Sequence, residues 1–187
     1  MTKLYISDLH LGHERILAID KRPVSTVEEN ERLISTNWNK AVSKSDIVYV
    51  LGDSSYYDYH HTMRIFNKLN GKKVFLRGNH DKWMNEPENR CNHMRYHEFL
   101  RVNDYLFGEP VTVALCHYPM CVWDKQFNGG YHLYGHIHIN KHPIVNCPDM
   151  QRSFNVGCMT KLMNYTPRTL EDIVIRSRSQ EFKNENG

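Results

Sequence analysis

Short apolar runs rich in β-branched and aromatic residues recur along the chain, and each is bounded by polar residues or glycine. This pattern is typical of buried strands. The runs cover residues 3–7, 46–51, 73–77, 111–116, 131–134 and 153–156. Helical patterns separate several of these runs, and strands that alternate with helices indicate an α/β fold.

The helical patterns are fewer and lie on either side of the predicted strands. A Ser/Thr-x-x-Glu capping box followed by apolar residues at helical intervals predicts a helix over residues 26–43. Further helices are expected over 62–69 and after a cap at Thr169. We find no repeat or linker, so the chain is predicted to be one domain, 1–187, whose polar end at 180–187 frays.

Composition narrows the class of protein. The 24 basic and 21 acidic residues leave a net charge of +3, which excludes a strongly polybasic nucleic-acid or membrane-surface protein. The apolar runs are far shorter than a membrane span, so no membrane partner is expected. Five cysteines without a C-x-x-C pair argue against a disulfide framework and a zinc knuckle, and they favour a reducing, cytoplasmic setting. The twelve histidines are the unusual feature.

Five of the predicted strands end in residues that bind metal ions well. In layered α/β folds the ligand site lies beyond the carboxyl ends of the strands, so such residues converge there. Any single match is more often a turn with a hydrogen-bonded histidine, but five matches at the same structural position indicate a site. The residues are Asp8 with His10, Asp53, Asn79 with His80, His117, and His136 with His138.

The donor set defines the metals that would fit. Carboxylate and amide oxygens mixed with imidazole nitrogens suit manganese, iron, nickel or zinc. Seven candidate ligands exceed the needs of one ion. A shared carboxylate would hold two ions about 3.5–4 Å apart, an arrangement that clamps a phosphoryl group and generates hydroxide for in-line attack. Two divalent ions with Asp8 and Asp53 would leave the pocket positive by about two charges, which attracts phosphate.

The order of these motifs resembles that of the calcineurin-like metallophosphoesterases, and their context is similar to small phage and bacterial members. The resemblance extends over residues 4–156. It implies a double β-sandwich flanked by helices in four layers, with a two-metal site. The motifs are Asp8-x-His10, Gly52-Asp53, Gly78-Asn79-His80-Asp81, His117 and Gly135-His136-x-His138.

The resemblance also implies a role for each motif residue. One ion would be held by Asp8, His10, Asp53 and His138, and the other by Asp53, Asn79, His117 and His136, with Asp53 as the bridge. His80 would contact the phosphoryl oxygen or the leaving group, and Asp81 would orient His80. One departure affects the substrate loop. Many members carry an acidic residue shortly after the Gly-Asp motif, whereas this chain continues Ser54-Ser55-Tyr56-Tyr57-Asp58.

Several residues near the motifs are candidates for substrate binding. They are Asn79, Arg77, His13, Tyr56 and Trp123. Arg77 can bind phosphate or lie solvated at a strand end, and His13 can reach substrate or cap the following turn. The aromatic residues can stack a base or pack in the core.

These observations predict an enzyme, a two-metal phosphoester hydrolase that favours phosphodiesters, nucleotides or nucleic-acid ends. Two alternatives stay open, namely a phosphatase for phosphoproteins or other monoesters and a non-catalytic binding module on the same fold. A metallo-β-lactamase-type hydrolase is disfavoured. Its H-x-H-x-D-H motif fails here at Asn140-Lys141.

Overall fold

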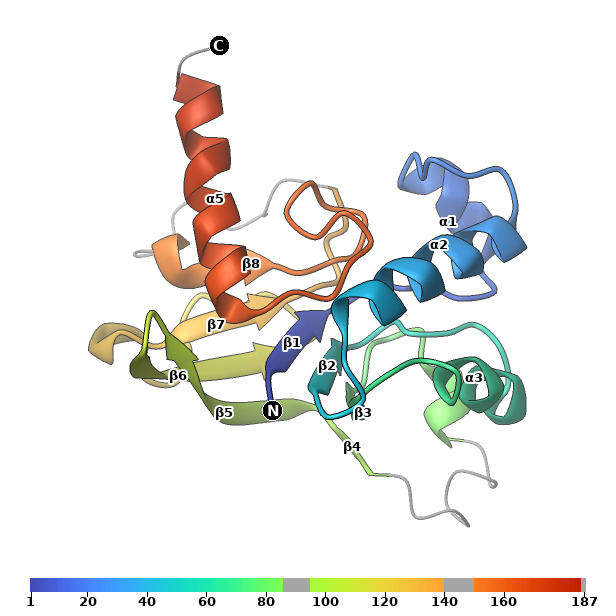
Figure 1. Cartoon of the computed structure of the whole chain (residues 1–187), viewed down its shortest axis with the longest axis horizontal. Helices are drawn as coiled ribbons and strands as arrows, with labels where there is room; N and C mark the ends of the chain where they lie inside the picture. The colour runs from blue at the N-terminus through green and yellow to red at the C-terminus, as the bar shows by residue number, and fades with distance from the viewer. Residues whose placement is uncertain (86–94, 140–149, 186–187) are drawn as a thin grey trace.

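The computed structural model describes residues 1–85, 95–139 and 150–185, and its strands form two four-stranded sheets (Figure 1). The first sheet is parallel throughout, with neighbours in chain order. Its strands are β1 (Lys3–Ile6), β2 (Ile47–Leu51), β3 (Lys72–Leu76) and β4 (Tyr96–His97). Three of these strands were predicted from the sequence, and β1 and β2 are almost wholly buried because both faces of the sheet are covered.

The second sheet is mixed. Its strands, also in chain order, are β5 (Phe99–Leu106), β6 (Glu109–Cys116), β7 (Tyr131–Tyr134) and β8 (Ser153–Asn155). β5 and β6 are antiparallel, whereas β6, β7 and β8 run parallel. Phe107 and Gly108 connect β5 to β6 and both have positive φ, 52° and 86°, as a tight two-residue hairpin turn requires. The sequence pattern did not predict β5, although Gly108 is the kind of turn residue that marks a hairpin.

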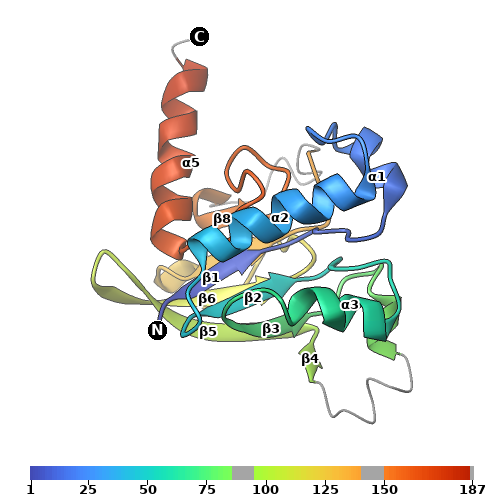
Figure 2. The same ribbon diagram turned by 45° about the vertical axis from the view of Figure 1, so that its right-hand side comes forward.

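Helices cover the outer faces of the sheets, which completes the predicted α/β double sandwich. In Figures 1 and 2, α2 and α3 lie over the first sheet, and α5 rises beside β8. The helices are α1 (Glu14–Ile19), α2 (Val27–Ala41), α3 (Tyr59–Phe66) and α5 (Leu170–Glu185). Short 3₁₀ turns are found at Lys82–Asn85, Gln126–Asn128 and Met150–Arg152.

Capping residues explain where two of these helices begin. Thr26 and Glu29 form the predicted capping box, in which the Thr26 hydroxyl accepts from the Glu29 amide at 3.2 Å. The helix predicted over 62–69 is instead α3, three residues nearer the N-terminus. The reason is Asp58, whose carboxylate accepts from the His61 amide at 2.7 Å and so starts the helix earlier.

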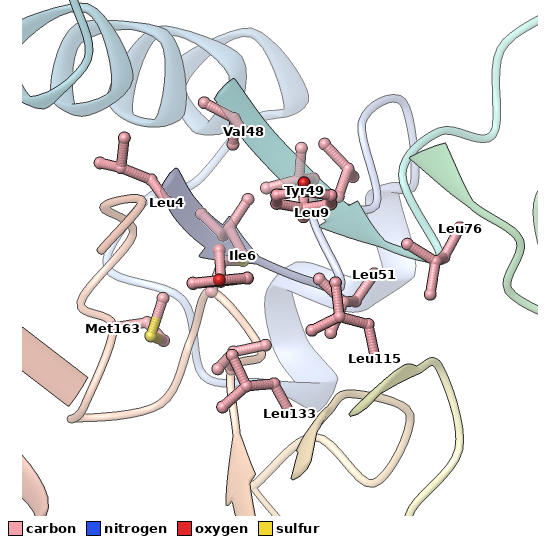
Figure 3. Packing of buried hydrophobic residues seen from close by; sticks show 14 of the residues in the cluster. Leu4, Ile6, Leu9, Val48, Tyr49, Leu51, Leu76, Leu115, Leu133 and Met163 are labelled. Carbon is pink, nitrogen blue, oxygen red and sulfur yellow. The ribbon is translucent and has the colours of Figure 1, made fainter. Parts of the chain in front are cut away.

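The main core lies between the two sheets (Figure 3). Ile6 and Leu51 of the first sheet and Leu115 and Leu133 of the second sheet are fully buried. Met163, from the segment before α5, is buried with them. Burying side chains of this size stabilises the fold by about 1.5–3 kcal/mol each, and this joins the sheets so that their strand ends keep a constant separation.

Some predictions concern features outside the sheets. Cys116 and Cys158 are free thiols, but Cys121 is disulfide-bonded, so the prediction against disulfides is wrong at this position. Residue spacing alone does not reveal which thiols the fold brings together. Among the described residues, no helix has both the length and the apolar character to cross a bilayer. α5 continues to Glu185. The polar pattern of residues 87–96 indicates no definite element, and most of this segment lies outside the described residues.

Candidate metal centre

All seven candidate ligands lie just beyond the carboxyl ends of five strands, three in the first sheet and two in the second. Asp8 and His10 follow β1, Asp53 follows β2, Asn79 follows β3, His117 follows β6, and His136 and His138 follow β7. Backbone hydrogen bonds connect neighbouring loops within each sheet. The Asp8 amide donates to the Gly52 carbonyl at 3.1 Å, and the Gly135 amide donates to the His117 carbonyl at 2.9 Å.

Four of the ligands form what we call the first ligand group: Asp8, His10, Asp53 and His138. One side-chain donor atom from each lies within 4.8 Å of the others. Asp8, His10 and Asp53 are at most 1% exposed, and His138 is half-buried. Two carboxylates and two imidazoles at this separation can hold one divalent transition-metal ion.

The second ligand group consists of Asn79, His117 and His136, and it adjoins the first through Asp53. His117 Nε2 lies 3.2 Å from Asn79 Oδ1, and His136 Nδ1 lies 3.0 Å from the same oxygen. Asp53 Oδ2 lies 3.5 Å from both His10 Nε2 and His117 Nε2. Asp53 is therefore the carboxylate that can serve both groups.

An unpaired nitrogen in the first group supports metal binding. His10 Nε2 is buried, and it has no hydrogen-bond partner among the described residues. A buried polar atom without a partner costs about 1–3 kcal/mol, so such atoms are rare in folded proteins. Burial also lowers the pKa of His10 to about 3, which leaves this imidazole neutral, the form that binds metal. The residues present therefore fit a bound cation.

Most of the ligands have an unusual backbone conformation. Asp8, His10, Asp53, His136 and His138 all have positive φ, between 48° and 71°. Residues other than glycine adopt this left-handed region at a cost on the order of 1–3 kcal/mol each when held there by their surroundings. Five such residues in one place mark a functional site, because packing elsewhere must offset the strain.

Two glycines allow the strand ends to approach this closely. A Cβ atom at Gly78 would collide with Asp53, and one at Gly135 would collide with Ser7 and Asp8. Neither glycine tolerates a side chain unless the candidate ligands move. Glycine before Asn79 and His136 is thus a requirement of the ligand geometry.

Hydrogen bonds at Nδ1 fix the orientation of two of the ligand histidines. His117 Nδ1 lies 2.8 Å from the Leu51 carbonyl, and His138 Nδ1 lies 2.8 Å from Asp20 Oδ1. A ring nitrogen bonded in this way leaves Nε2 to face the metal position. Asp20 is in turn bound by Arg22, at 2.9 and 3.1 Å.

Asp20 and Arg22 were missed by the sequence reading. Arg22 is fully buried, and it also donates to the carbonyls of Leu9 and Asp8, next to the ligands. Nothing in the spacing of Asp20 and Arg22 distinguishes them from surface residues. The charges of the pair cancel, so they leave the predicted net charge of the pocket unchanged.

The buried charged side chains of the site change one another's pKa values. Burial raises the pKa of Asp8 to about 6. Burial would also raise the pKa of Asp53, but the hydrogen bond and positive charge of His117 lower it to about 2. Burial alone would lower the pKa of His117, but the nearby carboxylates of Asp53 and Asp8 raise it to about 9. Asp53 and His117 thus form a buried ion pair whose proton a metal ion must displace.

The two predicted catalytic residues occupy different surroundings. The His80 amide donates to Asp53 Oδ1 at 2.8 Å, which places His80 beside the ligand groups. Its ring Nδ1 lies 2.6 Å from the hydroxyl of Tyr56. The Asp81 carboxylate is buried and accepts from Gly78, Ser54, Ser55 and Trp83. The expected contact of Asp81 with the His80 ring is absent among the described residues, because the neighbouring loops occupy that carboxylate.

The predicted substrate residues divide into two sets. His13, Tyr56 and Asn79 lie at the ligand groups, with His13 stacked on Tyr56 at a centroid distance of 3.9 Å. His13 starts α1, but its side chain makes no capping bond. Arg77 is half-buried, ion-paired with Glu98 at 3.7 Å. Trp123 is a correction, because it is only 5% exposed and donates to the Gly130 carbonyl, so it packs inside the protein.

Comparisons with known proteins agree with this geometry. The family model described as calcineurin-like phosphoesterase matches residues 1–140. An uncharacterized protein of Methanocaldococcus jannaschii is 34% identical over 180 residues, which cover 93% of this chain and 90% of that protein. The Gene 66 protein of Mycobacterium phage L5 is 27% identical over 160 residues, covering 72% of this chain and 76% of the phage protein.

One solved structure shows the same fold. It is the crystal structure of a protein of unknown function from Aquifex aeolicus, with a TM-score of 0.63 and 22% sequence identity. The alignment covers 91% of this chain and 96% of that chain. At this level of identity the similarity concerns the fold alone.

Proposed function

The chain belongs to the calcineurin-like phosphoesterase family, and we propose that it is a two-metal hydrolase of phosphodiesters or nucleotide-type substrates. The observation that carries the proposal is the buried first ligand group with its unpaired His10 Nε2. The position of Asp53 between the two groups supports a second ion. The candidate ions are manganese, nickel, iron and zinc, since the donors are oxygen and nitrogen.

Each part of the site has a definite task in this proposal. The chemistry that divalent ions supply at such a site is neutralisation of phosphoryl charge and activation of a water molecule. The ligand groups would keep bound ions at a constant separation, because the backbones of these residues belong to two packed sheets. Asp20 and Leu51 keep His138 and His117 in the required orientation.

His80 is the residue that we expect to act on the substrate. Its amide donates to Asp53, and its ring lies 5.6 Å from the ring of His10, so it would be close to a bound ion without being needed as a ligand. There it can stabilise a phosphoryl oxygen or donate a proton to the leaving group, and such a group contributes about 10²–10⁴-fold in rate. The presence of His80 with a complete ligand set favours an enzyme over a binding module.

The preference for diesters rests on what surrounds the opening. Tyr118 is 44% exposed, and its ring contacts the ligand histidine His136 at a centroid distance of 4.7 Å. Exposed aromatic rings beside a phosphate site can stack a base or an aryl group. A phosphatase for phosphoproteins or other monoesters is the alternative.

A metal-reconstitution experiment tests the proposal. The protein is stripped with a chelator and restored with manganese, nickel, iron or zinc in turn. Activity is then measured on bis(p-nitrophenyl) phosphate and p-nitrophenyl phosphate side by side. We expect two ions per chain and faster diester hydrolysis. Activity that survives verified metal removal would overturn the metal assignment, and preference for the monoester would establish the alternative.

A further inference from the structure

We propose that Tyr56 is the positioning residue for His80, so that this tyrosine acts in catalysis through the histidine and not as a base-stacking surface. The inference rests on the proposed function, because His80 is taken as the residue that acts on the substrate. The bond between Tyr56 Oη and His80 Nδ1 is 2.6 Å long, which is short for a hydrogen bond between neutral groups.

No carboxylate performs this task in the described part of the chain. Asp81, next in sequence, is 1% exposed, and its two oxygens accept from three backbone amides, one hydroxyl and the indole of Trp83. Asp53 accepts from the backbone amide of His80. Tyr56 is therefore the side chain bonded to the His80 ring.

Tyr56 is itself held in place, as a positioning residue must be. Its amide donates to the Leu11 carbonyl at 2.8 Å, which ties the loop after β2 to the loop after β1. Its ring stacks on His13 with an angle of 13° between the planes.

The bond has a definite chemical consequence. With Nδ1 of His80 engaged by Tyr56, Nε2 is the ring nitrogen left for a substrate oxygen. Tyr56 and His80 also line one cavity of about 310 Å³ together with Lys82 and Trp83, so the pair faces space that a substrate group can enter. Loss of the hydroxyl frees the ring to rotate and moves Nε2 away from the reacting atoms.

Kinetics of Tyr56→Phe test the proposal, with Tyr105→Phe as the control. Tyr105 is 67% exposed and lies at the hairpin end of β5, whereas His117 follows the opposite end of β6. We expect Tyr56→Phe to lower kcat about 10-fold on an alkyl-leaving diester, the loss expected for one hydrogen bond, with KM nearly unchanged. The loss should be smaller with nitrophenolate, a leaving group that needs no proton. Tyr105→Phe should change kcat less than two-fold.

A double mutant separates positioning from a general structural effect. In a His80→Ala background, Tyr56→Phe should cost nothing further, because the residue it positions is gone. An equal loss in both backgrounds would overturn the proposal. A rise in KM for nucleotides with unchanged kcat would also overturn it, since this result would mean that Tyr56 binds the base.

An NMR measurement tests the bond without any turnover. In protein with ¹⁵N-labelled histidine, the His80 ring signals are identified by their loss in His80→Ala. We expect Tyr56→Phe to shift these signals and Tyr105→Phe, on the exposed end of β5, to leave them unchanged. Unshifted signals in Tyr56→Phe would overturn the inference even if the enzyme is active. Lack of activity in the metal-loaded wild-type protein would instead overturn the proposed function.

Discussion

The two ligand groups of the site share Asp53 but differ in what surrounds them. In the first group Asp8 and His10 are buried, and His138 is bonded to Asp20, which Arg22 holds. Asp20 and Arg22, which hold His138, both lie in the protein interior. This group resembles a structural site, in which the ligands are in place before an ion arrives.

The second group opens toward solvent. Asn79 is exposed, His136 is half-buried, and the exposed ring of Tyr118 packs edge-on against His136. His117 is the buried member of this group, and it carries the proton shared with Asp53. Under the proposed two-ion function, we expect the first group to retain its ion, and the second group to exchange its ion and contact the substrate.

The largest effect should come from Asp53→Asn, since this change affects both groups at once. We expect bound metal to fall below two ions per chain and activity to fall by about 10³-fold or more, given that losing one electrostatic contact alone costs about 10²–10³-fold. Elemental analysis and diester hydrolysis are the measurements. Asp124→Asn is the matched control, because that exposed carboxylate pairs with Arg101. If Asp53→Asn retained two ions and full activity, the assignment of Asp53 as the shared ligand would be wrong.

The pH dependence of stability should distinguish the second group. The pKa of His117 is raised to about 9 in the folded protein, so its pairing with Asp53 stabilises the fold fully below about pH 6.5. That stabilisation is lost as pH rises through 9. In chelator, the free energy of unfolding should fall by about 2 kcal/mol between pH 7 and 9.

Two controls accompany this measurement by chemical denaturation. His117→Asn should remove most of the pH dependence in chelator. Metal-loaded protein should lack the decline, because the ion replaces the proton. A metal-free wild-type protein with constant stability over this range would contradict the buried ion pair.

A smaller and selective effect should follow from Asp20→Asn. The substitution weakens the bond that orients His138, and loss of such an outer contact typically costs about 10–100-fold in metal affinity. We expect one ion to dissociate more readily while the other is retained, measured by titration with a competing chelator. Equal weakening of both ions would show that the groups are not independent.

The smallest effect concerns Tyr118 at the open side. Tyr118→Ala should raise KM several-fold for a nucleotide substrate and leave bis(p-nitrophenyl) phosphate less affected, because stacking of a base is worth roughly 1–3 kcal/mol. Tyr105→Ala is the control, since this residue is 67% exposed on β5. Identical losses on both substrates would assign Tyr118 to the support of His136.

The sequence predicted the strands that end at the site, and the structure places the seven candidate ligands just beyond those ends. Strand ends are encoded locally, by an apolar run that stops at a polar residue, and parallel strands bring such ends to one edge. The same reasoning missed β5, whose inward-facing apolar positions are interrupted by Asp104. It also misjudged Trp123, because an aromatic residue near a motif has the same local pattern whether it packs inside or faces substrate.

By itself, then, the sequence determined which side chains are available to bind metal and in what order the strands present them. The tertiary structure decided the remaining features: the left-handed backbone at five ligands, the support of His138 by Asp20 and Arg22, and the contact of Tyr56 with His80. The last two features are contacts between side chains of different loops. Only packing of the two sheets brings such segments together, and no local pattern records a contact made across that distance.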